Sequence, residues 1–253
     1  MRTVSPFPIE SQTSPRDKAF LLAAQRLIRD AAPAYDYLEI GSFLGGSLAP
    51  FLADPACRSI LSIDERGRTL ADERGARFDY AGVSTQSMLD RLHQAGLPTE
   101  KLITHDGPID TLAPPDRPFD LAFIDGEHTD QACFRDFLWA LPLMKDDSAI
   151  LFHDSSLVYK AVGLITLLLR KQDRPFALLK NRNSEMSAIF LGGLGQCELG
   201  RYFEAGEDCA DFYAASEIAM LEHNIRNRVR IGPGAERLVS FTIEPPRAEK
   251  GYY

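Results

Sequence analysis

Two apolar stretches in the middle of the chain, 119–124 and 149–152, each end in side chains that can hold a metal ion. Asp125 directly follows the first stretch, and His153 and Asp154 follow the second. Neighbouring parallel strands open onto the same edge of a sheet, so these side chains would meet there. Carboxylate oxygens suit a hard cation such as Mg²⁺. The pattern predicts a metal site. Taken separately, a turn after the strand would explain Asp125, and a helix cap would explain His153 and Asp154.

Glu127 and His128, just beyond Asp125, are candidates for a general base. Glu127 lies two residues after Asp125 in a predicted turn, so its carboxylate can face the same cleft. His128 has the more suitable ordinary pKa, about 6.5. Position in the turn favours Glu127, and the sequence leaves both residues open.

A glycine-rich segment near the start of the chain has the composition of a ligand-binding turn. Glu39 lies at the end of an apolar run, and Gly41, Gly45 and Gly46 follow it ahead of a predicted helix. Glycine lets the backbone approach a ligand closely and adopt a positive φ. The spacing is not that of dinucleotide-binding turns, and the segment lacks a phosphate-binding lysine, which disfavours NAD and P-loop chemistry. An acid here would suit a cationic ligand that carries amino groups and ribose hydroxyls.

Asp64 ends the next apolar run, 60–63. In nucleotide-binding folds an acid placed about 20 residues beyond the glycine turn binds ribose hydroxyls. Asp64 and the glycine turn are therefore better explained together, as parts of one cofactor site, than as two unrelated turns.

The elements that must position these residues alternate between strand and helix. Apolar runs predict buried strands at 37–40, 60–63, 102–104, 119–124, 149–152, 176–179 and 187–191. Helical periodicity predicts helices at 47–52, 84–95, 129–143, 158–170 and 211–228, and a last short strand is expected at 238–243. This alternation predicts an α/β fold: a doubly wound, mostly parallel sheet of about seven strands with helices on both faces.

The start of the first helix is predicted from Ser14, Pro15 and Asp17, which fit the cap, the first turn and the positive end of the helix dipole. The weaker patterns at both ends of the chain predict the domain organisation. We expect an N-terminal arm at 1–13, one domain at 14–192, and a C-terminal extension at 193–253 packed on that domain.

The charge and hydropathy of the chain exclude some partners. The 253 residues include 28 basic and 36 acidic side chains, for a net charge of −8. Such a surface repels phosphate backbones, so no nucleic-acid partner is expected. Apolar runs fall far short of the ~20 residues that a membrane span requires. We expect a cytoplasmic protein that does not bind membranes.

These motifs together resemble those of class I S-adenosylmethionine-dependent methyltransferases. The likeness rests on the ExGxxxGxS pattern at 39–47, the strand-end acid Asp64, the Ile-Asp-Gly sequence at 124–126 with His128, and the later His153-Asp154. It covers about 35–191 and is nearest to the small-molecule O-methyltransferase branch, of the macrocin O-methyltransferase and cephalosporin-biosynthesis type.

That branch also has an acid and a leucine at the positions of Asp136 and Leu143. The chain departs from its pattern where Asp130 replaces a tyrosine and where 146–148 replaces a Pro-Gly-Gly turn. The first change adds an acid near the sheet edge, and the second alters a loop.

The resemblance implies a Rossmann-like fold that binds S-adenosylmethionine. It assigns the methionine and ribose part of the cofactor to the glycine turn, the ribose hydroxyls to Asp64, and the flank of the adenine to the end of the third strand. The cofactor-binding residues it implies are Glu39, Gly41, Ser42, Gly45, Ser47, Asp64, Thr104, Asp106 and Asp125.

The activity implied is transfer of a methyl group to a hydroxyl of a small molecule, a sugar or a natural product. Asp125 and Asp154 would hold Mg²⁺ or another divalent cation, with His153 as a third ligand or as a residue that orients the ligands. Glu127 or His128 would take the proton. The arm and the C-terminal extension leave room for a homodimer.

Two alternatives remain open from the residues. A metallohydrolase or oxygenase could use the same histidine and carboxylate set with zinc or iron, although the glycine turn would then have no purpose. A catalytically silent protein on the same fold would bind S-adenosylmethionine without forming a methylated product.

Overall fold

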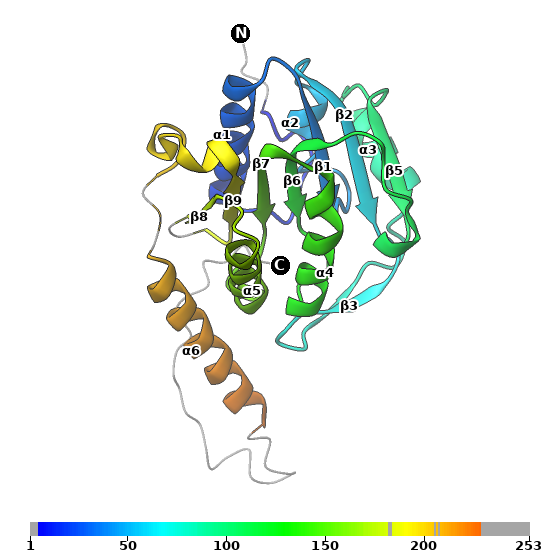
Figure 1. Cartoon of the computed structure of the whole chain (residues 1–253). Coiled ribbons are helices and arrows are strands. Elements are labelled where there is room, and N and C mark those ends of the chain that lie inside the picture. The colour runs from blue at the N-terminus through cyan, green and yellow to red at the C-terminus, as the bar shows by residue number, and fades with distance from the viewer. Residues whose placement is uncertain (1–4, 182–183, 205, 207, 229–253) are drawn as a thin grey trace.

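A seven-stranded sheet with five parallel strands forms the centre of the protein in the computed structural model (Figure 1). The structure describes residues 5–181, 184–204, 206 and 208–228. The strand order is β5-β2-β1-β6-β7-β9-β8, and β9 runs antiparallel to both β7 and β8. The strands of this sheet are β1 (Tyr35–Ile40), β2 (Cys57–Asp64), β5 (Leu102–Asp106), β6 (Phe119–Ile124), β7 (Met144–Phe152), β8 (Phe176–Lys180) and β9 (Ser187–Leu191). The predicted α/β fold with a mostly parallel sheet is confirmed.

The order of the strands reverses beside β1. From β1 the chain moves outward to β2 and β5, then returns to β6 on the other side of β1. Open α/β sheets bind their ligands beyond the carboxyl ends of the strands at such a switch point. The fold therefore places the loops after β1 and β6 side by side.

Helices cover both faces of the sheet, because the side chains along each buried strand point alternately into two apolar layers. Tyr35 and Tyr37 of β1 pack into one layer, and Leu38 and Ile40 pack into the other. The first layer contains α1 (Pro15–Ala31), α2 (Ala49–Leu52) and α3 (Thr85–Gln94). The second contains α4 (Asp130–Ala140), α5 (Tyr159–Lys171) and the 3-10 turn η1 (Ile109–Thr111). Further 3-10 turns are η2 (Leu141–Leu143), η3 (Gly192–Gln196) and η4 (Leu199–Arg201).

The last described helix, α6 (Cys209–Arg228), packs against α5. It begins shortly before the predicted helix at 211–228 and ends at the same residue. Tyr159 of α5 and Phe212 and Met220 of α6 form a small separate apolar cluster. Within the described part of the chain, every helix is too short or too polar to cross a membrane.

The sequence did not predict a small hairpin, β3 (Thr69–Ala71) and β4 (Arg77–Asp79), which forms its own two-stranded sheet. Two predicted helices are shorter than expected, since α2 has one turn and α4 ends at Ala140 ahead of η2. Pro142 explains the second case, because proline cannot donate a helical hydrogen bond. The strand expected at 238–243 lies outside the described residues.

Candidate active site

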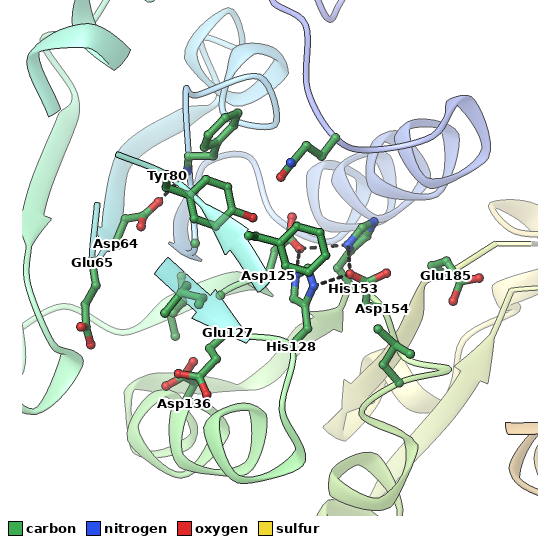
Figure 2. A pocket seen from close by; sticks show the side chains of 18 of the residues that line it. Asp64, Glu65, Tyr80, Asp125, Glu127, His128, Asp136, His153, Asp154 and Glu185 are labelled. Carbon is green, nitrogen blue, oxygen red and sulfur yellow. Dashed lines mark hydrogen bonds and ion pairs between the residues drawn. The ribbon is translucent and has the colours of Figure 1, made fainter. Parts of the chain in front are cut away.

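A cavity of about 540 Å³ lies at the switch point, beyond the carboxyl ends of β1, β2, β6 and β7. Its floor comes from the loops that follow these strands. The hairpin β3–β4, the arm residues Ser11 to Thr13 and helix α6 supply the remaining walls. Figure 2 shows that acids and histidines from separate loops point into this space.

The turn after β1 approaches the turn after β6 very closely. Gly41 has a φ of +90°, and a Cβ added there would lie 2.0 Å from the carbonyl oxygen of Asp125. Gly46 is similarly constrained, because its Cβ would lie 2.5 Å from Ser11 of the arm. The glycines therefore join three segments around the cavity, and Gly41, Gly46, Ser42 and Ser47 all line it.

Glu39 lies beneath this turn and does not line the cavity. Its side chain is fully buried and accepts hydrogen bonds from Tyr37 Oη (2.6 Å) and Ser47 Oγ (2.7 Å). Burial raises its pKa from the ordinary 4.5 to about 7, although both hydrogen bonds act in the other direction. Glu39 holds Ser47, which does line the cavity.

Asp64 lines the cavity from the end of β2. One carboxylate oxygen accepts a hydrogen bond from the backbone N–H of Phe43 at 2.6 Å, and Arg66 Nη2 lies 4.0 Å from the same oxygen. Burial raises the pKa of Asp64, and the charge of Arg66 opposes that effect. The Phe43 contact joins the end of β2 to the glycine turn.

Three other predicted cofactor residues lie outside the cavity lining. Gly45 has a φ of +81° and packs against Met88 and Leu92 of α3. Thr104 pairs with Ser62 in the ladder between β5 and β2. Asp106 is exposed and accepts a hydrogen bond from Thr85 Oγ1 at 2.8 Å, whereas its neighbour Gly107 does line the cavity.

Asp125, His128, His153 and Asp154 form one cluster, in which a ligand atom of each lies within 4.8 Å of the others (Figure 2). His153 Nδ1 lies 2.9 Å from Asp125 Oδ1 and 3.5 Å from Asp154 Oδ2. His128 Nδ1 lies 2.7 Å from Asp154 Oδ2, and its Nε2 lies 3.5 Å from Asp125 Oδ1. The predicted convergence of residues from the ends of β6 and β7 is therefore present in the structure.

The charges of the cluster shift its pKa values strongly. Burial alone would lower the pKa of His128, but hydrogen bonds and charge from Asp125 and Asp154 raise it to about 10. The same two carboxylates raise the pKa of buried His153 well above its ordinary value. Burial acts to raise the pKa of Asp154, but the two histidines hold it well below its usual range. The carboxylates of the cluster therefore favour the charged forms of both histidines, and the histidines favour the charged form of Asp154.

Glu127 has different neighbours from His128. Its carboxylate accepts a hydrogen bond from Thr129 Oγ1 at 3.0 Å, and Figure 2 shows it directed toward Asp136 of α4. Asp136 is buried, and Arg135 lies 2.8 Å from its Oδ1. Burial raises the pKa of Asp136 to about 6, against the hydrogen bond from Arg135. Both Glu127 and His128 line the cavity, at different places along it.

Several residues that line the cavity were missed by the sequence analysis. Phe78 and Tyr80 come from the hairpin, and Met220 and His223 come from α6. Tyr80 packs edge-on against Phe43 with ring centroids 5.4 Å apart, and His223 Nε2 lies 3.1 Å from the carbonyl oxygen of Arg74. Their types and spacing carry no local signal, because only the tertiary fold brings them to the cavity.

Comparison with known proteins agrees with this architecture. Residues 38–155 match the family described as a methyltransferase domain. The solved structure of the O-methyltransferase NovP is 12% identical with a TM-score of 0.54, and the match covers 68% of this chain and 79% of that one. The O-methyltransferase TomG from Streptomyces achromogenes, solved with SAM, is 19% identical with a TM-score of 0.49 over 71% of this chain and 81% of its own. A search of curated proteins finds no match.

The matched segment begins in β1 and ends just past Asp154, so it contains the glycine turn, Asp64 and the acid–histidine cluster. NovP shares the fold of the chain around it. The likeness first indicated by the motifs is confirmed for this segment: residues 38–155 of the chain form a methyltransferase domain.

Proposed function

We propose that this methyltransferase acts on a hydroxyl group of a small molecule, with help from a divalent cation held by the acid–histidine cluster. The single observation that carries the proposal is the position of that cluster at the wall of the same cavity that Gly41 and Asp64 line. The solved relative NovP is described as an O-methyltransferase, which supports oxygen as the acceptor atom.

The glycine turn and the end of β2 would bind the cofactor. Because Gly41 has no Cβ, the turn after β1 can pack against the backbone of Asp125 and still line the cavity with its own backbone. Ser42 and Ser47 would bind the methionine part, and Asp64 the ribose hydroxyls with the carboxylate oxygen that Phe43 does not use. Glu39 would act through Ser47, whereas Gly45, Thr104 and Asp106 would shape the surrounding loops.

Asp125, His153 and Asp154 fit a divalent cation. They supply two carboxylates and one imidazole, and neither ring nitrogen of buried His153 makes a well-directed hydrogen bond among the described residues. Buried polar atoms normally have hydrogen-bond partners. Nδ1 of His153 instead lies at ion-pair distance from Asp125 and Asp154, where it would bind a cation held by both acids. When bound, a divalent cation lowers the pKa of a hydroxyl that it contacts.

His128 is the better placed of the two candidate bases. Its Nδ1 lies 2.7 Å from Asp154, which fixes the ring, and its Nε2 remains on the side of Asp125. A dication beside these two acids would lower the pKa of His128 from the ligand-free value, so that Nε2 can accept the hydroxyl proton. Glu127 points toward Asp136 and would serve the cofactor end of the cavity.

Transfer of a labelled methyl group tests the proposal. The protein is incubated with methyl-labelled S-adenosylmethionine and a fractionated metabolite extract, with Mg²⁺ or with a chelator, and products are identified by mass spectrometry. We expect a labelled methyl ether whose formation falls at least tenfold with chelator and returns when Mg²⁺ is added.

Three results would contradict parts of this account. A labelled product with the methyl group on nitrogen or carbon would refute the acceptor assignment. Turnover that is unchanged by chelator would refute the role of the cation. Tight S-adenosylhomocysteine binding without any labelled product, across extracts that support a known O-methyltransferase, would indicate a silent binding protein.

A further inference from the structure

Asp17, in the first turn of α1, lies directly behind the acid–histidine cluster. Its side chain is fully buried, and its Oδ2 lies 3.6 Å from His153 Nε2. Asp17 is not among the residues that line the cavity, and His153 is the member of the cluster that it contacts. The sequence pattern explains Asp17 as an acid at a helix start, which accounts for its contact with the cap but not for His153.

The surrounding groups hold the Asp17 carboxylate in one place. Its Oδ1 accepts hydrogen bonds from the backbone N–H of Glu185 at 3.0 Å and from Ser184 Oγ. Its Oδ2 accepts from the backbone N–H and the hydroxyl of Ser14, which completes the capping box of α1. A buried carboxylate is costly unless it is paired in this way. Against the effect of burial, the contact with His153 and the charge of that ring lower the pKa of Asp17 to about 2.

His153 therefore lies between two acidic groups. Its Nε2 faces Asp17, and its Nδ1 faces Asp125 and Asp154. The ring of Phe123 packs edge-on against the imidazole, with centroids 6.1 Å apart, and limits its rotation. The two nitrogens of the ring are thus chemically distinct: one meets a carboxylate fixed to α1, and the other meets the groups that border the cavity.

We propose that Asp17 is a positioning residue: its carboxylate, 3.6 Å from His153 Nε2, would accept a hydrogen bond from the Nε2–H when the cation is bound, so that Nδ1 is the nitrogen that binds the cation beside Asp125 and Asp154. A histidine ligand usually donates its second ring N–H to a carboxylate, which fixes the tautomer and raises the basicity of the ligating nitrogen. The inference rests on the cation of the proposed function. It extends the site to α1, outside the segment that carries the methyltransferase motifs.

Two variants separate this role from helix capping. Asp17→Asn keeps the size of the side chain and an acceptor oxygen but removes the charge that faces His153. Ser14→Ala removes the cap contact to the same carboxylate and leaves its charge facing His153. Mn²⁺ affinity is measured by EPR, and S-adenosylhomocysteine affinity is measured by calorimetry on the full chain.

We expect Asp17→Asn to weaken Mn²⁺ binding by about 10–100-fold, the usual effect of losing such a partner, with S-adenosylhomocysteine affinity within about twofold of the wild type. Ser14→Ala should change Mn²⁺ affinity by less than about threefold. Long-range ¹H–¹⁵N spectra of the Mg²⁺-loaded wild type should show His153 protonated at Nε2 and not at Nδ1.

Several outcomes would overturn the inference. Equal loss of Mn²⁺ affinity in both variants would reduce Asp17 to a helix cap, and unchanged affinity in Asp17→Asn would remove its role altogether. His153 protonated at Nδ1 in the Mg²⁺-loaded protein would reverse the proposed tautomer. A wild type that binds no Mn²⁺ would refute the cation itself, and with it the proposed function, which distinguishes that failure from the others.

Discussion

The backbone carbonyl of Asp125 occupies the space that a side chain on Gly41 would need. A Cβ at Gly41 would lie 2.0 Å from that oxygen, closer than real Cβ contacts come. The turn after β1 and the turn after β6 are consequently one packed unit, and the side chain of Asp125 extends from it toward His153. The contact therefore links Gly41, on the side of the cavity proposed for the cofactor, to Asp125, on the side proposed for the cation.

Gly41→Ala should therefore damage the site and the fold together. The new methyl group meets backbone, and φ of +90° is unfavourable for alanine, so we expect a loss of about 3–5 kcal/mol in unfolding free energy. Gly82→Ala is the matched control, because Gly82 has a φ of +84° with nothing within 4 Å of an added Cβ. It should lose about 1–2 kcal/mol. Urea denaturation compares the two, and equal losses would disprove the close contact.

Asp64 and Asp125 should separate cofactor binding from turnover. Asp64→Ala should weaken S-adenosylhomocysteine binding at least tenfold, because a charged hydrogen-bond acceptor is worth about 1.5–3 kcal/mol. Asp125→Ala should lower kcat more than about 100-fold while the calorimetric Kd for S-adenosylhomocysteine stays within about threefold. If Asp125→Ala lost affinity and turnover by the same factor, its assignment to the cation would be wrong.

His128 and Glu127 should differ as bases. His128→Asn should lower kcat by about 10²–10⁴, the usual contribution of a general base, and should remove the lower-pH limb of the kcat profile. Glu127→Gln should change kcat by less than about threefold, because its carboxylate faces Thr129 and Asp136. Both variants are assayed with saturating cofactor from mildly acidic to alkaline pH, and the opposite ranking would assign the base to Glu127.

Glu39 should make the protein less stable as the pH rises. The unfolded chain releases this proton near pH 4.5 and the folded protein near pH 7. Between these values the unfolded state binds fewer protons, so the unfolding free energy falls, by up to about 3 kcal/mol, and it stays level once both states have lost the proton. Glu39→Gln should make this decline smaller by the contribution of Glu39, while the raised pKa values of Asp136 and His128 keep their own contributions. Glu100→Gln, at an exposed position, should leave the whole decline in place. Urea denaturation at a series of pH values across this window measures the slope for each variant, and a slope in Glu39→Gln equal to that of the wild type would show that Glu39 does not contribute to it.

Much of this architecture could be predicted from the sequence because the signals are local. Apolar runs indicated β1, β2, β6 and β7, and the rule for parallel sheets brought Asp125 and Asp154 together. The direction of β9 was not predictable, since an apolar run looks the same in either direction. The hairpin β3–β4 was missed because each strand has three residues and none of them is buried.

The parts of the site that could not be predicted depend on long-range contacts. Asp17 has all the local properties of a helix cap, and its approach to His153 exists only because α1 packs behind the ends of β6 and β7. The different surroundings of His128 and Glu127 also depend on long-range contacts. Adjacent residues in one turn face different neighbours, Asp154 in one case and Asp136 in the other.

The central claim is that cofactor and cation share one cavity, and paramagnetic broadening tests it most directly. Mn²⁺ is titrated into the complex of the protein with S-adenosylmethionine carrying a ¹³C-labelled methyl group, and the methyl resonance of the bound cofactor is followed. We expect strong broadening in the wild type that disappears in Asp125→Ala while the cofactor stays bound. Saturable Mn²⁺ binding that leaves this resonance sharp would place the cation elsewhere and contradict the account.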